Sequence, residues 1–371
     1  MPGQQILHQN EAKLTEQFLE AFTSATKAKV VSRQFDLHFV CEGDSRLDVL
    51  AEVVLPGGQR VPLAIELRAE GYPRDMHQAV WQLECFANST HAAATAAQPF
   101  VVAEKLSPGA RESLRSRGIN YFDSSGTLHF QYATWLVDIE RAFKNKRSRR
   151  PSALFTDARE QVIHALLHRW RVEDNEWVTG AELAKTSGTS SYTVSLMMKE
   201  LERHEWVETQ GKGPLTRRRL KNASALLDAW AEAWGQRKDS RTRWFVYSRS
   251  PASLLDTLQP KLEGRERWAF TGAAAANILA PRLTSVDQIA IIVPPGEAAQ
   301  WAMEIGMEPA EKGPNVTFIE RSGASLMFLD EHPEREGSRF ASPFIQYLDL
   351  LDGRGRNKEL AAYLRSNVLK L

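Results

Sequence analysis

Residues 177–221 read WVTGAELAKTSGTSSYTVSLMMKELERHEWVETQGKGPLTRRRLK, and this stretch decides how the middle of the chain folds. Thr179 followed three residues later by Glu182 is a capping box, in which two side chains satisfy each other's backbone N–H groups. We therefore predict a short helix over residues 180–185. Ser187-Gly188-Thr189 supplies the tight turn that ends it.

A longer helix follows this turn. Ser190 or Ser191 is expected to cap it, and it ends near His204. Its buried face is predicted from apolar residues at helical spacing: Val194, Met197, Met198 and Leu201. A short helix, a glycine turn and a longer helix form the helix-turn-helix pattern, in which the second helix enters the DNA major groove. Polar residues on this helix are candidates for contacts to base edges and phosphates: Ser190, Ser191, Tyr192, Thr193, Ser195 and Lys199.

A helix over residues 157–170 is predicted before this pair, with an apolar face of Val162, Ile163, Leu166 and Leu167. After the pair, residues 206–209 and 217–221 are expected to form a hairpin around Gly211-Lys212-Gly213-Pro214. Its basic side chains suit phosphates: Lys212, Arg217, Arg218 and Arg219. Together these elements predict a winged helix-turn-helix over residues 155–235 that binds double-stranded DNA. Winged helices also serve as protein–protein modules, and this alternative stays open.

The charge distribution adds to this interpretation. The net charge is only +1, but residues 212–221 carry five basic side chains and residues 141–150 carry six, with no acid in either run. Local cation density matters for phosphate binding, because each neutralised phosphate releases condensed counterions. Taken alone, each run is equally compatible with a solvated turn or linker.

Composition limits the class of protein. The chain has 371 residues, of which 43% are hydrophobic and 25% charged, as in soluble proteins of two or three domains. Its longest apolar runs are far shorter than the ~20 residues of a membrane span, and its N-terminus does not resemble a signal peptide. Cys41 and Cys85 provide neither a disulfide framework nor metal-ligand spacing. We expect a cytoplasmic protein without a membrane partner.

The fold class expected is α+β with several domains. Residues 1–145 alternate helix and strand patterns and predict an α/β domain with a mixed sheet. Residues 155–235 form the helical middle block. Residues 240–371 return to alternating elements and predict a C-terminal α/β domain, whose last strand is expected at 325–328.

The first block contains RLDVLAEVVLPGGQRVPLAIELRAEGYPRDMHQAVWQL at residues 46–83. This stretch resembles the restriction-endonuclease-like PD-(D/E)xK fold, which places an Asp on one strand of a hairpin and Glu-x-Lys on the next. The resemblance assigns these positions to Asp48 and Glu66. It implies a Mg²⁺ site made by the two carboxylates, with Glu16 or Glu20 of the opening helix as a further ligand.

The sequence departs from this pattern at Arg68, which stands where the family has Lys. Arginine stays protonated, so it can clamp a phosphate but cannot exchange a proton with water. Gln78 and Gln82, on the following helix, suit contacts to phosphate or base better than catalysis. Two interpretations remain: an active Mg²⁺-dependent DNA endonuclease using Glu16, Asp48, Glu66 and Arg68, or a scaffold that only binds nucleic acid or a partner.

The third block contains AFTGAAAANILAP at residues 269–281 and FIQYLDLLDGRGRNKELAAYLR at residues 344–365. Together with the preceding winged helix, these segments resemble the AbiEi-type antitoxins of type IV toxin–antitoxin systems, over about residues 155–371. The resemblance implies a transcriptional regulator that needs no cofactor. Its expected partners are double-stranded DNA and either a toxin protein or a second copy of the chain.

Overall fold

The computed structural model describes residues 2–41, 43–89, 96–141, 154–284, 286–331, 337–353 and 356–371. Contacts divide the chain into two compact units, residues 1–148 with 202–205, and residues 149–201 with 206–371. The predicted blocks 155–235 and 240–371 thus fall mainly within one unit. Of the basic run at 141–150, only Arg141 belongs to the described residues.

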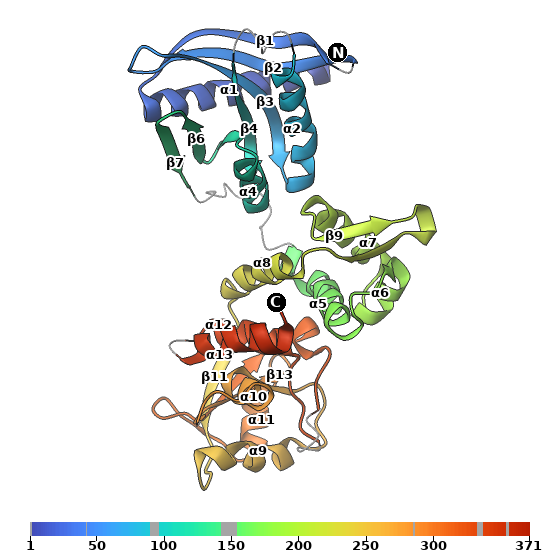
Figure 1. The fold of residues 1–371 in the computed structure, drawn as a ribbon. Helices are drawn as coiled ribbons and strands as arrows, with labels where there is room; N and C mark the ends of the chain where they lie inside the picture. Colours follow the sequence, from blue (N-terminus) through green and yellow to red (C-terminus); the bar gives the residue numbers. More distant parts are fainter. Residues whose placement is uncertain are drawn as a thin grey trace. The chain divides into compact units, whose positions relative to one another are not determined.

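The first unit is built on a seven-stranded sheet in the order β1-β2-β3-β4-β5-β6-β7 (Figure 1). The strands are β1 Lys29–Cys41, β2 Gly43–Val54, β3 Arg60–Gly71, β4 Gln98–Leu106, β5 Asn120–Asp123, β6 Leu128–Tyr132 and β7 Trp135–Ile139. Strands β3, β4 and β5 run parallel, whereas the remaining neighbours pair antiparallel. The predicted mixed sheet is therefore confirmed.

Helices cover both faces of this sheet. Helix α1 Pro2–Thr26 places Phe18 and Phe22 on one face, with the Phe18 ring centroid 4.9 Å from that of Phe100. Helices α2 Pro73–Ala87 and α4 Pro108–Ser116 pack on the other face. Alternation along β3 explains this arrangement, because successive side chains of a strand point to opposite faces.

Cys41 at the end of β1 and Cys85 on α2 form a disulfide, with their Cα atoms 5.8 Å apart. The sequence predicted no disulfide framework from these two residues, and it did not predict this single bridge. Their sequence separation of 44 hides the contact, because only the packing of α2 against the sheet brings them together.

The second unit begins with helix α5 Asp157–Val172. It continues with β8 Val178–Thr179, α6 Gly180–Ser187, α7 Ser191–Arg203, β9 Val207–Gln210, β10 Arg217–Leu220 and α8 Ala223–Gly235. The three strands pair antiparallel in the order β8-β10-β9. Every predicted helix and strand of this region is present, each within a few residues of its expected bounds.

The rest of the unit contains a five-stranded sheet in the order β12-β13-β15-β11-β14. Its strands are β11 Ser240–Phe245, β12 Ala269–Thr271, β13 Ile289–Val293, β14 Glu308–Pro309 and β15 Val316–Glu320. The helices are α9 Leu254–Leu262, α10 Gly272–Leu279, α11 Ala298–Glu304, α12 Pro343–Leu351 and α13 Arg356–Leu364. The strand expected at 325–328 is not formed. Residues Gly323–Leu326 make a 3₁₀ turn there, in which Ala324 and Ser325 are buried.

One hydrophobic core joins the two parts of this second unit. Ile163 on α5 and Trp230 on α8 belong to the same buried cluster as Phe344 and Leu348 on α12. Both nitrogens of the buried His164 ring also cross this boundary, at 2.6 Å from Ser342 Oγ and 2.8 Å from the Ala324 carbonyl oxygen. Residues of the predicted blocks 155–235 and 240–371 thus share one hydrophobic core.

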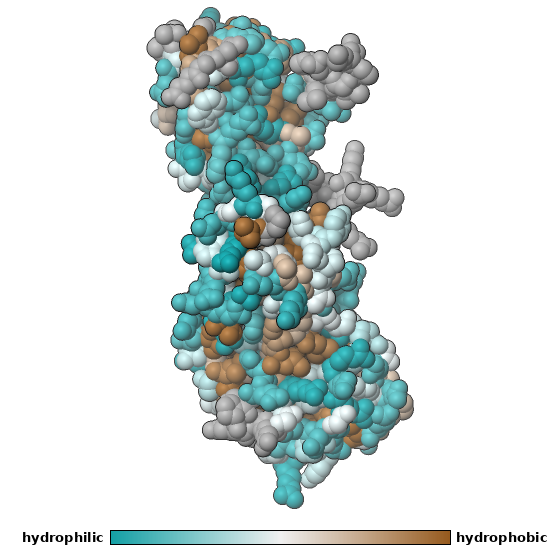
Figure 2. Space-filling view, turned by 90° about the vertical axis from the view of Figure 1, so that its right-hand side faces the viewer, coloured by the Kyte–Doolittle hydropathy of each residue, from teal (hydrophilic) through white to brown (hydrophobic). Residues whose placement is uncertain are grey.

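The surface is mainly hydrophilic on the face shown in Figure 2, with hydrophobic residues gathered in limited areas. None of the helices within the described residues is long and apolar enough to cross a membrane.

Candidate nucleic-acid interface

Local interactions define both ends of helix α6. Glu182 Oε2 accepts hydrogen bonds from the backbone N–H and the hydroxyl of Thr179, both at 2.8 Å, while Glu182 N–H donates back to Thr179 Oγ1 at 3.2 Å. The backbone hydrogen bond from Thr179 is the main reason that the pKa of Glu182 is lowered. Gly188 ends α6 in the left-handed region, with φ at +64°. The predicted capping box and glycine turn are confirmed.

Helix α7 has one buried and one exposed face. All four residues predicted to be buried are buried: Val194, Met197, Met198 and Leu201. The exposed residues of the opposite face are Ser191, Tyr192, Ser195 and Lys199. Ser190 acts as the N-cap, because its Oγ accepts the Thr193 backbone N–H at 3.1 Å and lies 2.9 Å from Thr193 Oγ1. Ser190 and Thr193 therefore serve the cap as well as belonging to the candidate set.

The three arginines of β10 occupy different environments. Arg219 is paired with Glu208 of β9 at 2.9 Å, and its guanidinium lies 4.6 Å from the centroid of the Trp177 ring. Alternation places Arg218 on the opposite face of the strand, the face of the buried Leu220. Arg217 is exposed and enters none of the ion pairs among the described residues. The sequence alone does not distinguish the three arginines. Which face of β10 each side chain occupies depends on the pairing register of the strand, and the structure supplies that register.

The hairpin loop also contains an exposed apolar side chain that was not among the candidates predicted from the sequence. Leu215 is 80% exposed, next to the exposed Lys212 and Arg217. In the sequence, Leu215 is recognisable as an apolar residue inside a basic loop. The alternation patterns that identify strands do not consider loop residues of this kind. The exposed surface of α7 and the hairpin thus combines polar, cationic and apolar groups.

The carboxylates predicted in the first unit do come together. Pairing between β2 and β3 stops at Val49 and Ile65, and one residue further Asp48 Oδ2 accepts the backbone N–H of Leu67 at 2.8 Å. The Arg68 guanidinium lies between the two acids, with Nη1 3.1 Å from Glu66 Oε2 and 3.6 Å from Asp48 Oδ2.

Glu66 is fully buried, and its carboxylate lies against the Arg68 guanidinium at 3.1 Å. Burial, and then the charge of Asp48, raise the pKa of Glu66 to about 8. Both polar atoms of the Gln82 amide help to hold the region: Oε1 accepts from Arg68 Nη2 at 2.9 Å, and Nε2 donates to the Arg46 carbonyl oxygen at 3.3 Å.

These residues do not fit a Mg²⁺ ion as they stand. A divalent ion bridging Asp48 and Glu66 would need the space between their carboxylates, which the Arg68 guanidinium occupies. Among the described residues, no group of three or more acidic, His or Cys side chains is arranged to hold a metal ion.

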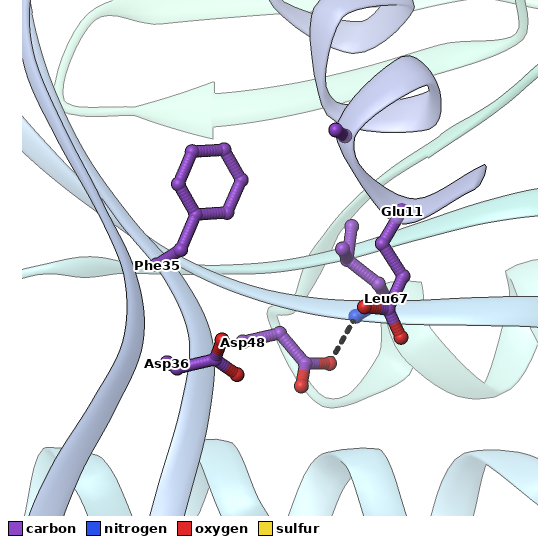
Figure 3. Close-up of a pocket in the computed structure, with 6 residues that line it drawn as sticks. Glu11, Phe35, Asp36, Asp48 and Leu67 are labelled. Atoms are coloured by element: carbon purple, nitrogen blue, oxygen red, sulfur yellow. Dashed lines mark hydrogen bonds between the residues drawn. The ribbon is translucent and has the colours of Figure 1, made fainter. Parts of the chain in front are cut away.

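A shallow pocket of about 150 Å³ lies beside Asp48 (Figure 3). Glu11, Phe35, Asp36 and Leu67 are among its lining residues. Helix α1 thus contributes Glu11 to this pocket, while Glu16 pairs with Arg33 at 2.9 Å, and Glu20 and Gln78 are exposed. The roles that the sequence analysis gave to Glu16, Asp48, Glu66 and Arg68 remain predictions.

The C-terminal signature contributes a buried ion-pair network. Arg321 on the chain after β15 lies 2.6 Å from Asp349 of α12 and 2.5 Å from Asp239. Asp349 also accepts hydrogen bonds from Thr271 Oγ1 at 2.5 Å and from the Trp234 indole at 3.2 Å. Asp349 therefore connects α8, β12 and α12. Arg354 and Gly355 of the signature lie outside the described residues.

Comparison with known proteins gives a match for this part of the chain. Residues 219–370 match a family model described as "Transcriptional regulator, AbiEi antitoxin, Type IV TA system". Searches of curated proteins and of solved structures gave no match. The matched region contains the Asp349 network, the five-stranded sheet and helix α8. Over residues 219–370, the chain is therefore similar to the AbiEi antitoxin transcriptional regulators of type IV toxin–antitoxin systems.

Proposed function

We propose that the chain is a transcriptional regulator of the antitoxin type that binds double-stranded DNA through α7 and the β9–β10 hairpin. The observation that carries the proposal is the exposed face of Ser191, Tyr192, Ser195 and Lys199, in the same packed body as a basic hairpin. The order of helices and the β8-β10-β9 sheet match a winged helix-turn-helix, which supports this assignment.

Within this proposal, the contacts divide by type. The N-terminal half of α7 enters the major groove, where Tyr192 and Ser195 meet base edges or phosphates. Lys199, Lys212 and Arg217 contact the phosphate backbone and set the position of the helix. Arg219 acts indirectly, because its pairing with Glu208 and its contact with Trp177 stiffen the hairpin.

The family description also supports a toxin partner, since antitoxins of such systems act together with a toxin. Nothing in the proposed activity requires a metal or cofactor. The candidate partners therefore remain DNA, a toxin protein and a second copy of the chain.

The test is binding of the full chain to a duplex from the region upstream of its own coding sequence, measured by fluorescence anisotropy at several salt concentrations. The variant Lys199→Ala/Arg217→Ala is expected to bind at least about tenfold more weakly. Its plot of log affinity against log salt should lose roughly two units of slope, about one for each lost phosphate contact.

The matched control is Arg243→Ala/Arg249→Ala, which also removes two exposed cations of the second unit. The control is expected to bind like the unaltered protein. Equal weakening in both double variants would assign the binding to general positive charge and would reject the proposed surface.

A further inference from the structure

A large apolar residue, Leu215, lies in the loop of the basic hairpin between β9 and β10. Leu215 is 80% exposed, whereas Val194, Met197, Met198 and Leu201 of α7 are buried. Single exposed apolar residues are common on protein surfaces and need no special role. Leu215 differs in its setting, because residues 212–221 around it contain five cations and no acid.

The backbone of this loop is held in one conformation. Residues Gly213–Leu215 form a 3₁₀ turn, and Thr216 donates its N–H and its hydroxyl to the Gly213 carbonyl at 3.2 and 2.7 Å. Gly211 has φ at +85°, and a Cβ at this position would lie 3.0 Å from the Leu215 carbonyl oxygen. Leu215 is therefore exposed on a closed turn. The backbone that enters the turn at Gly211 packs against the backbone that leaves it at Leu215.

We infer that Leu215 is an apolar wedge that enters the minor groove and partly unstacks one base step of the bound duplex. This inference rests on the proposed function and deepens it by assigning a second groove contact. The minor groove is about 6 Å wide, and proteins that insert there use leucine and similar side chains between base steps. Lys212 and Arg217, on either side of the leucine in the sequence, are available to the phosphates that line that groove.

The mixture of groups distinguishes DNA from a protein occupant. A protein surface that buried Leu215 would also need acids for Lys212 and Arg217. A duplex offers both requirements at once, since its phosphates are anionic and its stacked bases are apolar. Wedging also predicts where the protein binds, because pyrimidine–purine steps such as TA and CA are the easiest to unstack and kink.

The experiment uses the full chain and the duplex from its own upstream region, with a donor and an acceptor dye at the two ends. The fluorescent base 2-aminopurine replaces adenine at each TA or CA step in turn. Unaltered protein is expected to increase 2-aminopurine fluorescence at one step and to raise energy transfer between the ends, because unstacking bends the duplex.

Three variants distinguish the effect of the apolar side chain on the DNA from the effect of the positive charges. Leu215→Ala is expected to bind about two- to tenfold more weakly and to give neither signal at saturation, because the wedge is lost while the cations remain. Leu215→Met keeps an apolar wedge and should keep both signals. Lys212→Ala should weaken binding and reduce the salt slope by about one, yet produce the same bend at saturation.

Each other outcome has a definite meaning. If Leu215→Ala bends the duplex and unstacks the step as well as the unaltered protein, the wedge is wrong although DNA binding stands. If the unaltered protein does not bind the duplex, the proposed function itself fails. Loss of self-association in Leu215→Ala by analytical ultracentrifugation, with bending retained, would assign the leucine to a protein contact and overturn the inference.

Discussion

At the scale of single residues, Glu66 has the most unusual environment in the first unit. Its carboxyl group is fully buried next to the charges of Asp48 and Arg68. Desolvation disfavours the ionised form, so the proton is held to a pH of about 8. An unfolded chain releases the same proton near 4.5.

This difference predicts how stability depends on pH. The stabilisation from protonated Glu66 is fully present below about pH 4.5 and is lost as the pH rises through about 8. We expect the melting temperature of the first unit to fall between pH 5 and pH 8, measured by calorimetry on the full chain. Glu66→Gln, which cannot ionise, should fall distinctly less.

Glu20→Gln is the matched control, because Glu20 is an exposed carboxylate of the same unit. It should follow the pH dependence of the unaltered protein. A Glu66→Gln variant with the same fall as the unaltered protein would show that Glu66 is not the titrating group.

At the scale of elements, the turn between α6 and α7 sets the angle at which α7 leaves α6. Gly188 makes this turn with φ at +64°, a conformation that is strained for residues with a Cβ. Space is not the limitation, since a Cβ at Gly188 would meet no atom within 4 Å. Any effect of adding a methyl group there is therefore a backbone effect.

The variant Gly188→Ala is expected to lower the free energy of unfolding by about 1 kcal/mol, the usual difference for a left-handed position. Gly235→Ala provides the comparison. A Cβ at Gly235 also meets no atom within 4 Å, but this glycine ends α8 without a positive φ. Gly235→Ala should leave stability unchanged or raise it slightly. Denaturant unfolding of both variants checks this, and equal destabilisation would contradict it.

At the scale of the whole molecule, two regions pack together. One is the region proposed to bind DNA, and the other is the region matched by the AbiEi family model, residues 219–370. The apolar residues of α5 and α8 share one core with those of α12 and α13. Burial lowers the pKa of His164 to about 3, so its ring stays neutral while it contacts Ser342 and Ala324. The middle region and the C-terminal region are therefore in direct contact.

This shared core predicts that a fragment of residues 154–235 will not fold by itself. Exposing several of its large apolar side chains, at about 1.5–3 kcal/mol each, exceeds the ~5–15 kcal/mol that stabilises a typical domain. A fragment of residues 154–371 should unfold cooperatively by circular dichroism, whereas 154–235 should show no cooperative transition. Equal melting temperatures for the two fragments would mean that the middle region is an autonomous domain.

The sequence by itself determined the local structure of residues 177–221. The capping box at Thr179, the turn at Gly188 and the buried face of α7 each depend on residues within about four positions of one another, and such interactions can be read from spacing. The same local logic correctly predicted the mixed sheet of the first unit. It also placed Asp48 and Glu66 on neighbouring strands.

Only the tertiary structure decided which side chains are held by other residues and which are exposed to a partner. It tied Arg219 to Glu208 and Trp177 while leaving Arg217 exposed, and it placed Arg68 between two carboxylates. It also paired Cys41 with Cys85 and Arg321 with Asp349. These contacts join residues on separate elements, up to 44 positions apart, and local spacing does not encode them. They form because the packing of apolar faces fixes which elements are neighbours, and polar side chains then pair within that arrangement.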